Sequence, residues 1–451
     1  MNSDAGRRGS LRLRSSFPAA IPVVGLVFLL VVVAGVGALW LGWFRPATLT
    51  AQESVTAQGT DPAPLIPGMP VCLPVPTNEG SMPVPTEPAP SRSVFGLAWF
   101  HKPPDDGTTP GEFVEHHSYV HLTGPADIPY RDELRDAGYK GPVYTYVTMN
   151  AIEGPGPYRD ASASCDEDYT PYDNQLAFYK GDFCKYIHPN ESWFLHNGAG
   201  ARIVDDYFGA GRYSYVMNPA DPGWRSFAVE RLNFVKETWF YDGIWLDNVD
   251  VDRARVMSGL TNSDGELREY DSDDAWREAV KGWLAAARNA LGDYPLWANL
   301  VEGPLRADAW DAYAPYLDGA MDESFAVRWI DGWRDPGHWQ AQIQRAQRWL
   351  AMGKGLVAVG QGPHEDAERM RFALASYMLV AEGTQATFRY TRFDTYYSQF
   401  WLYPDYETAR RLGAPLGSCR EVSPNIWRRD FERGYVEVNV QGHEGRLVTE
   451  P

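Results

Sequence analysis

The stretch that decides the fold runs from residue 241 to residue 250 and reads YDGIWLDNVD. It opens on an Asp-Gly pair, continues through the apolar residues Ile244 to Leu246, and reaches Asp247 where the apolar run stops. A short apolar run between turn residues is typical of a strand buried on both faces of a parallel sheet. In a barrel of parallel strands, chemistry takes place at the C-terminal strand ends. Asp247 is therefore the first candidate for an active site, since a buried carboxylate without a partner or a function costs free energy.

A second stretch, DGAMDESF at residues 318–325, repeats this arrangement further along the chain and carries Glu323. Its neighbour Asp322 is a direct rival, because side chains alternate along a strand and only one of the two turns toward the barrel axis. The sequence leaves open which one does so. Two carboxylates at the ends of two strands are what the hydrolysis of a glycosidic bond requires.

Short apolar runs alternate with longer amphipathic segments over most of the chain, which predicts a parallel sheet with crossover helices. Eight runs qualify as strands: 94–100, 118–122, 143–149, 243–247, 296–300, 319–323, 356–359 and 387–390. Helices are expected near 130–137 and over 272–291, 338–352 and 365–381. Eight strands with helices between most of them predict an α/β fold, a (β/α)8 TIM barrel over residues 93–424.

Two segments depart from this alternation. Residues 151–211 form a long excursion after the third strand, and their aromatic content argues against disorder. After the barrel, residues 425–440 read as two short strands around a turn at Glu432 to Gly434. We expect a small C-terminal β-hairpin and tail over residues 425–451.

The N-terminal region predicts attachment to a membrane. Residues 1–16 are basic, and residues 17–44 carry no charge and are long enough to cross a bilayer. Basic residues before the apolar run place the N-terminus in the cytoplasm and the rest outside. We favour an uncleaved, single-pass signal anchor at 17–45 over a cleaved signal peptide, because the apolar run is long. Residues 46–92 are Pro-rich and predict an extended linker.

The composition restricts the partners. The formal net charge is −18, which argues against nucleic acid and against polyanionic substrates. The 17 Trp and 25 Tyr suit either a large aromatic core or a cleft in which sugars stack on aromatic rings. We therefore expect a neutral or amino-sugar polysaccharide or oligosaccharide as substrate. The sequence does not indicate the oligomeric state.

Outside the cytoplasm, the four cysteines can form disulfides. None of them has metal-ligand spacing. Cys165 and Cys184 are the first expected pair, Cys72 and Cys419 are the second, and free thiols are the alternative.

Several segments occur in an order known from one family. HPNESWFL at 188–195 and GARI at 200–203 precede Asn218-Pro219, the two acid-bearing strands follow, and RRDFERGYVEVNV at 428–440 ends the series. In this order, over about residues 95–440, the chain resembles the hydrolases grouped as hypothetical glycosyl hydrolase family 15. That group is similar in barrel pattern to the endo-α-1,4-polygalactosaminidases.

The resemblance implies a barrel with acids at its fourth and sixth strands, Asp247 as nucleophile and Glu323 as acid/base. Two alternatives to Glu323 stay open: Asp322, and Glu302 after the fifth strand, where amylase-type barrels carry their proton donor. The predicted function is that of a membrane-anchored, extracytoplasmic glycoside hydrolase with a retaining mechanism. The alternative is a non-catalytic glycan-binding or polysaccharide-assembly protein on the same barrel.

Further side chains near predicted strand ends are candidates for sugar contacts, with packing at the barrel rim as the alternative for each. They are Trp99, His101, Tyr146, Asn299, Gln361 and Arg389. Asn299 is also placed to donate a hydrogen bond to the nucleophile. His116 and His117 lack acidic or cysteine companions at metal-binding spacing, so we predict neither a metal nor a cofactor.

Overall fold

The computed structural model of the chain describes residues 71–72, 95–205, 212–258, 262, 264–301, 307–327, 332–381, 385–392 and 397–450. The predicted cytoplasmic tail and membrane anchor, and nearly all of the predicted linker, lie outside these ranges. Within the described ranges, no helix is both long and apolar enough to cross a membrane.

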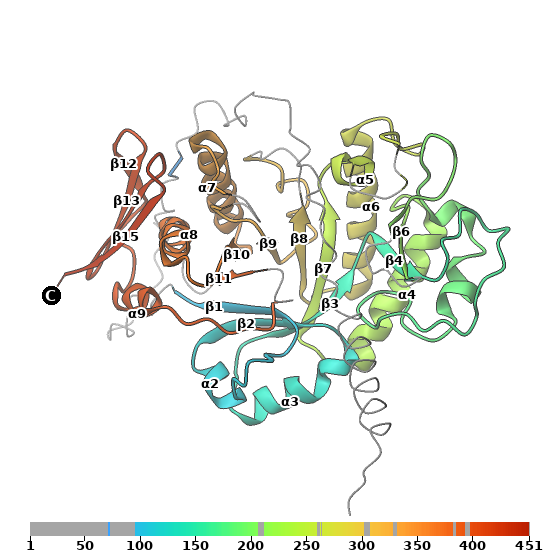
Figure 1. Ribbon diagram of the computed structural model, residues 1–451, viewed down its shortest axis with the longest axis horizontal. Helices are drawn as coiled ribbons and strands as arrows, with labels where there is room; N and C mark the ends of the chain where they lie inside the picture. The colour runs from blue at the N-terminus through green and yellow to red at the C-terminus, as the bar shows by residue number, and fades with distance from the viewer. Residues whose placement is uncertain are drawn as a thin grey trace, which may run out of the picture. The chain divides into compact units, whose positions relative to one another are not determined.

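Eight parallel strands close into a barrel in chain order, with the last strand returning to the first (Figure 1). They are β1 (Leu97–His101), β2 (His117–Leu122), β3 (Val143–Thr148), β7 (Gly243–Asp250), β8 (Leu296–Val301), β9 (Gly319–Asp322), β10 (Gly355–Gln361) and β11 (Ala386–Thr391). This confirms the predicted TIM barrel, and each predicted strand overlaps one of the eight.

Helices follow most strands and lie on the outside of the barrel (Figure 1). Their bounds are α2 (Pro110–Val114), α3 (Ile128–Asp136), α4 (Pro222–Thr238), α5 (Ala254–Ser258), α6 (Asp273–Leu291), α7 (Pro336–Ala351), α8 (Ala367–Val380) and α9 (Pro404–Arg411). α4 is not among the predicted helices. Its start carries a helix signal nonetheless, because Asp221 accepts hydrogen bonds from the backbone amides of Gly223 and Trp224 and Pro222 opens the first turn.

The N-terminal end of the barrel interior, which we call the floor, consists of Tyr119, Tyr144 and Trp297 packed over Gly319 and Gly355. The ring centroid of Trp297 lies 4.9 Å from that of Tyr119 and 5.5 Å from that of Tyr144. A Cβ atom at Gly319 or Gly355 would lie within 2.3 Å of the Trp297 indole. The two glycines therefore leave the space that the indole fills, as close packing in a barrel core requires.

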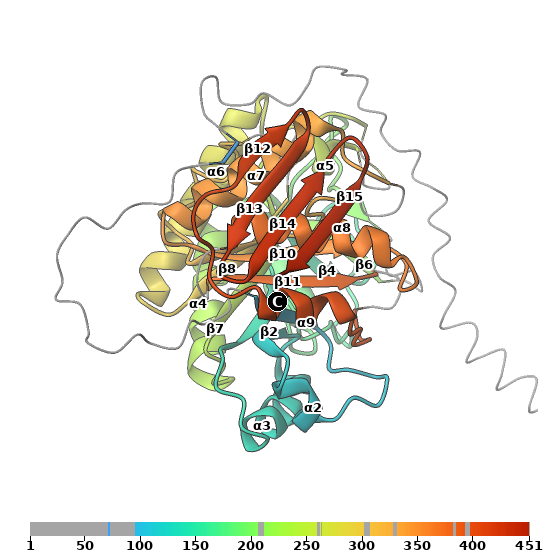
Figure 2. The same cartoon turned by 90° about the vertical axis from the view of Figure 1, so that its left-hand side faces the viewer.

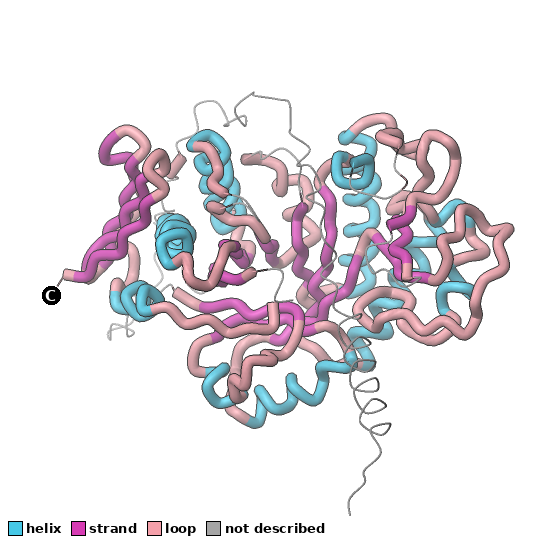
Figure 3. Tube along the Cα trace, in the orientation of Figure 1, coloured by secondary structure: helices cyan, strands magenta, loops and turns pink. Residues whose placement is uncertain are grey.

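The excursion after β3 consists largely of loops and turns (Figure 3). It also contributes a three-stranded antiparallel sheet of β4 (Ala151–Gly154), β6 (Tyr213–Val216) and β5 (Val204–Asp205). The predicted disulfide between Cys165 and Cys184 is present. The fully buried Arg202 donates hydrogen bonds to Glu191 and to the backbone carbonyl of His188. These charge-assisted contacts join the two family-like segments, 188–195 and 200–203.

The C-terminal segment contains the predicted hairpin, as its two inner strands, and adds one strand on either side, so that four antiparallel strands form one sheet (Figure 2). They are β12 (Arg420–Ser423), β13 (Ile426–Phe431), β14 (Gly434–Asn439) and β15 (Glu444–Thr449). β12 is wholly exposed, and β15 consists of exposed and half-buried residues with none buried. Neither strand therefore shows the alternation of buried and exposed residues that marked the inner pair. The second predicted disulfide, between Cys72 and Cys419, joins the segment before the barrel to the start of this sheet.

Candidate active site

Two carboxylates meet at the C-terminal end of the barrel, which we call the mouth. Asp247 belongs to β7, and Glu323 directly follows β9. Asn299 of β8 lies between them, and its side-chain Nδ2 donates to Asp247 Oδ1 at 3.1 Å and to Glu323 Oε2 at 2.9 Å. Two oxygens at these distances from one nitrogen cannot be more than about 6 Å apart. The acids that the sequence separates by two strands therefore share one site.

Each carboxylate also accepts a hydrogen bond from a tyrosine. Tyr146 of β3 donates its hydroxyl to Asp247 Oδ2 at 2.5 Å, and Tyr397, beyond β11, donates to Glu323 Oε1 at 2.6 Å. The pKa of both phenols is raised well above the ordinary value. Burial is the main cause, and the charge of the adjacent carboxylate is the second. Both hydroxyls therefore stay protonated and act as donors at neutral pH.

Unusual backbone conformations surround the carboxylates. β7 contains an extra residue relative to β8 between Leu246 and Val249, which is a β-bulge at Asp247 and Asn248. Asn248 has φ = 57°, and His101, Ala326 and Tyr397 also have positive φ, at 84°, 62° and 59°. Non-glycine residues adopt this region rarely, and they concentrate where function requires a particular geometry.

Glu323, rather than Asp322, faces the other carboxylate. Asp322 points to the outside of the barrel, where its Oδ2 accepts from Arg345 Nη2 at 2.5 Å and from Gln342 Nε2 at 2.7 Å. Burial raises the pKa of Asp322, and Gln342 and Arg345 are also buried. Asp322 thus belongs to the packing between β9 and α7. Glu302, the other alternative, lies outside the described residues.

Two more of the predicted side chains surround the pair. The His101 ring lies 5.8 Å from the ring of Tyr146 and 6.2 Å from that of Tyr397, centroid to centroid. Burial lowers the pKa of His101 to about 3, so its imidazole is neutral at neutral pH. Gln361 is fully buried and donates to the backbone carbonyl of Glu323 at 2.8 Å. It therefore supports the main chain at Glu323 and does not face an open cleft.

Comparison with known families assigns the chain to an enzyme class. The family model described as hypothetical glycosyl hydrolase family 15 matches residues 158–435, more than half of the chain. The chain belongs to this family. It is accordingly a glycoside hydrolase, and both carboxylates lie within the matched region. No curated protein matches the chain.

Three of the solved structures that match the chain at low identity are glycoside hydrolases. The glycoside hydrolase domain of PelA from Pseudomonas aeruginosa is 16% identical and covers 69% of this chain and 98% of its own, with a TM-score of 0.42. An α-galactosidase from Thermus thermophilus is 12% identical, with coverages of 78% and 67% and a TM-score of 0.41. An α-amylase from Malbranchea cinnamomea is 11% identical, with coverages of 78% and 85% and a TM-score of 0.42. We draw no conclusion about site or substrate from similarities this distant.

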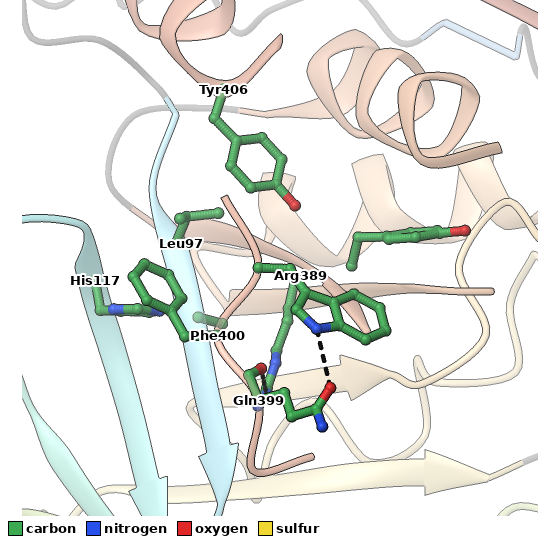
Figure 4. Close-up of a pocket in the computed structure, with 9 residues that line it drawn as sticks. Leu97, His117, Arg389, Gln399, Phe400 and Tyr406 are labelled. Carbon is green, nitrogen blue, oxygen red and sulfur yellow. Dashed lines mark hydrogen bonds between the residues drawn. The ribbon is translucent and has the colours of Figure 1, made fainter. Parts of the chain in front are cut away.

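Two predicted contacts of this family 15 hydrolase lie away from the carboxylates. Trp99 packs on the outer side of β1, with its ring centroid 5.3 Å from that of Phe113. Arg389 lies in the seam between β1 and β11, beside Gln399 and Phe400, where a cavity of about 10 Å³ remains (Figure 4). The structure therefore does not bring Trp99 or Arg389 to the carboxylates.

Sequence reasoning missed two residues of this hydrolase. Tyr397, which binds Glu323, lies in a segment without strand or helix pattern, and the Tyr-Tyr pair at 396–397 soon after the eighth strand was its one signal. His121 of β2 stacks on the indole of Trp245 at 4.0 Å between ring centroids, directly below the mouth. Its place on the same strand face as Tyr119, two residues earlier, could have indicated it.

Proposed function

We propose that this glycoside hydrolase cleaves a neutral or amino-sugar polysaccharide with retention of configuration, using Asp247 as nucleophile and Glu323 as acid/base. The observation that carries the proposal is the amide of Asn299, which donates to both acids and so limits their facing oxygens to about 6 Å apart. Retaining enzymes keep the two carboxyl groups about 5–5.5 Å apart, whereas inverting enzymes need about 6.5–9.5 Å for a water molecule. The spacing favours the retaining scheme.

In the first step, an Asp247 oxygen attacks the anomeric carbon and the bond to the leaving-group oxygen breaks, while Glu323 transfers its proton to that oxygen. In the second step, the Glu323 carboxylate takes a proton from water, and this water displaces Asp247 from the anomeric carbon. Tyr146 holds the attacking carboxylate, and Asn299 keeps the two acids in register. The neutral His101 at the edge of the pair is a candidate contact for a sugar hydroxyl.

We further propose that the enzyme works outside the cytoplasm, attached to the cell membrane by residues 17–45. The two disulfides support an oxidising compartment. The uncharged N-terminal run supports the anchor. The net charge of −18 supports a substrate that is neutral or positively charged.

The test uses the full chain in detergent with a panel of neutral and amino-sugar polysaccharides that includes α-1,4-linked galactosaminoglycan. New reducing ends are measured for the wild type, Asp247→Asn and Glu323→Gln, and proton NMR follows the anomer released first. We expect cleavage by the wild type, retention of the anomeric configuration and loss of activity in both variants. Inversion of the anomer would refute the retaining scheme, and full activity in either variant would refute the role of that residue.

A further inference from the structure

Tyr397 is held in place more firmly than a loop residue usually is. Its ring centroid lies 4.7 Å from that of Phe100 on β1. The residues that follow it are tied to the loop after β1, because Ser398 O accepts from the Asp105 amide at 2.9 Å and Asp106 Oδ2 accepts from the Phe400 amide at 2.6 Å. These contacts fix a backbone that has φ = 59° at Tyr397, a conformation that persists only when its surroundings impose it.

Two further side chains contact Tyr397: Gln361 donates from Nε2 to its hydroxyl at 3.5 Å, and Arg389 binds its backbone. β1 and β11 pair at Leu97 and Phe388. Next to this pair, the guanidinium of Arg389 joins β1 to the segment that carries Tyr397. It donates from Nη1 to the carbonyl of Phe100 at 3.0 Å and from Nη2 to the carbonyl of Tyr397. Its central carbon lies 4.0 Å from the centroid of the Trp99 ring. Burial lowers the pKa of Arg389 to about 9, so the group still carries its charge at neutral pH.

We propose that Tyr397, fixed by Arg389, is the positioning residue for the acid/base Glu323. The inference rests on the roles assigned to Asp247 and Glu323 above. The phenol donates to Glu323 Oε1 at 2.6 Å while Asn299 donates to Oε2 at 2.9 Å, so the carboxyl plane is held between two donors on opposite sides. Arg389 then affects the reaction by holding Tyr397 in place. This role takes the place of the sugar contact predicted for Arg389.

The chemistry gives Tyr397 a definite effect. A donor to a carboxylate stabilises the charged form, so it keeps Glu323 from binding a proton too tightly. Without the phenol, Glu323 loses a charge-assisted hydrogen bond and its fixed orientation. Proton donation to the leaving oxygen should then suffer, whereas the attack of Asp247, which has its own tyrosine, should not.

The test compares Tyr397→Phe with Tyr146→Phe and Tyr390→Phe in the full chain. Tyr390 is the matched control, because its buried hydroxyl donates to Pro363 O at 3.3 Å on the outer side of β11. Two aryl glycosides are used, made from the sugar of whichever polysaccharide the wild type cleaves; one has a dinitrophenyl and one an unsubstituted phenyl leaving group. Arg389→Lys is a second variant that acts on the position of Tyr397 through its carbonyl.

For Tyr397→Phe we expect kcat/KM on the phenyl glycoside to fall about 10- to 100-fold, and on the dinitrophenyl glycoside less than about threefold, because only the poor leaving group needs the acid. The alkaline limb of kcat/KM should move up by about one to two pH units. Tyr146→Phe should slow both substrates alike, Arg389→Lys should follow Tyr397→Phe with a smaller effect, and Tyr390→Phe should match the wild type. Equal losses on both glycosides in Tyr397→Phe, or an unmoved alkaline limb, would overturn the proposal.

A readout without catalysis separates this inference from the proposed function. In protein labelled with ¹³C at the glutamate carboxyl, the Glu323 signal is the one missing from Glu323→Gln. We expect its titration midpoint to rise in Tyr397→Phe and to stay unchanged in Tyr390→Phe. If the midpoint rises in a protein that cleaves none of the polysaccharides, the proposed function is refuted but the role of Tyr397 in positioning Glu323 is kept. If the midpoint does not rise, that role of Tyr397 is refuted.

Discussion

At the floor of the barrel Trp297 fills the space left by Gly319 and Gly355, and two residues further along β8 Asn299 joins two carboxylates at the mouth. Both side chains point inward from the same strand, because residues two apart share a face. The floor is aromatic and close-packed. The mouth is polar, and four residues with positive φ surround it.

In this barrel, then, packing at one end of the strands and chemistry at the other fall on different residues of the same strand, as on β8. A substitution at the floor disturbs packing shared by β2, β3, β8, β9 and β10, so it should lower the free energy of unfolding. At the mouth, residues with strained backbone hold the two carboxylates in a fixed arrangement. A substitution there should therefore lower activity.

Asp247→Asn should have the largest effect, a loss of kcat of about 10⁴-fold or more, because an amide cannot form the covalent intermediate. The melting temperature should change by no more than about 2 °C, since the shape is kept and Tyr146 retains a partner. Asp247→Gly with added azide is the control, and it should yield the glycosyl azide of inverted configuration. Loss of folding in Asp247→Asn would mean that the mouth also carries the stability of the barrel.

Glu323→Gln and Asp322→Asn compare two adjacent acids on opposite faces of the barrel wall. Glu323→Gln should lower kcat/KM on unactivated substrates by about 10²- to 10⁴-fold, as expected for a general acid, with little change in stability. Asp322→Asn should lower the free energy of unfolding by about 3 kcal/mol, because it leaves the buried Arg345 without its carboxylate. Chemical denaturation and initial rates measure both. A reversal of the two outcomes would contradict the assignment of faces.

Much of the barrel could be predicted, because its signals are local. Apolar runs between turn residues predicted the strands, and the strand-end position predicted Asp247. The orientation of Glu323 and Asp322 could not be predicted, because it depends on the register of β9 against its neighbours. Tyr397 was missed for a similar reason, since its bond to Glu323 joins residues 74 apart and depends on barrel closure. β12 and β15 were missed because exposed strands carry little hydrophobic pattern.

Gly355→Ala tests the floor directly. The added Cβ would lie 2.0 Å from the indole of Trp297, so the indole or the strands must move. We expect a loss of about 1–3 kcal/mol in the free energy of unfolding, the usual cost of an overpacked core, and an unchanged kcat/KM in the folded protein. Gly111→Ala is the control, because its Cβ would meet only the Thr109 hydroxyl, at 4.0 Å. A large loss of activity without a loss of stability would show that floor and mouth are coupled.

The smallest expected effect compares His101 at the mouth with His117, which stacks on Phe113 behind the barrel wall. Burial lowers the pKa of each to about 3, whereas an unfolded histidine binds a proton near pH 6.5. Between pH 6.5 and 3 the unfolded chain therefore binds more protons, and the free energy of unfolding falls as the pH is lowered. Each histidine should contribute a slope of about 1.4 kcal/mol per pH unit in that window.

Replacing either histidine by glutamine should therefore reduce this slope by the same amount, as measured by urea denaturation between pH 6.5 and 4. Activity should distinguish the two variants: His101→Gln should lower kcat/KM, because His101 adjoins both tyrosines of the acid pair, and His117→Gln should leave it unchanged. Equal losses of activity in the two variants would mean that the geometry of the mouth depends on the packing around His117 behind the barrel wall. If the slope of the free energy of unfolding against pH is unchanged in both variants, burial does not keep these histidines neutral, and they already bind protons in the folded protein.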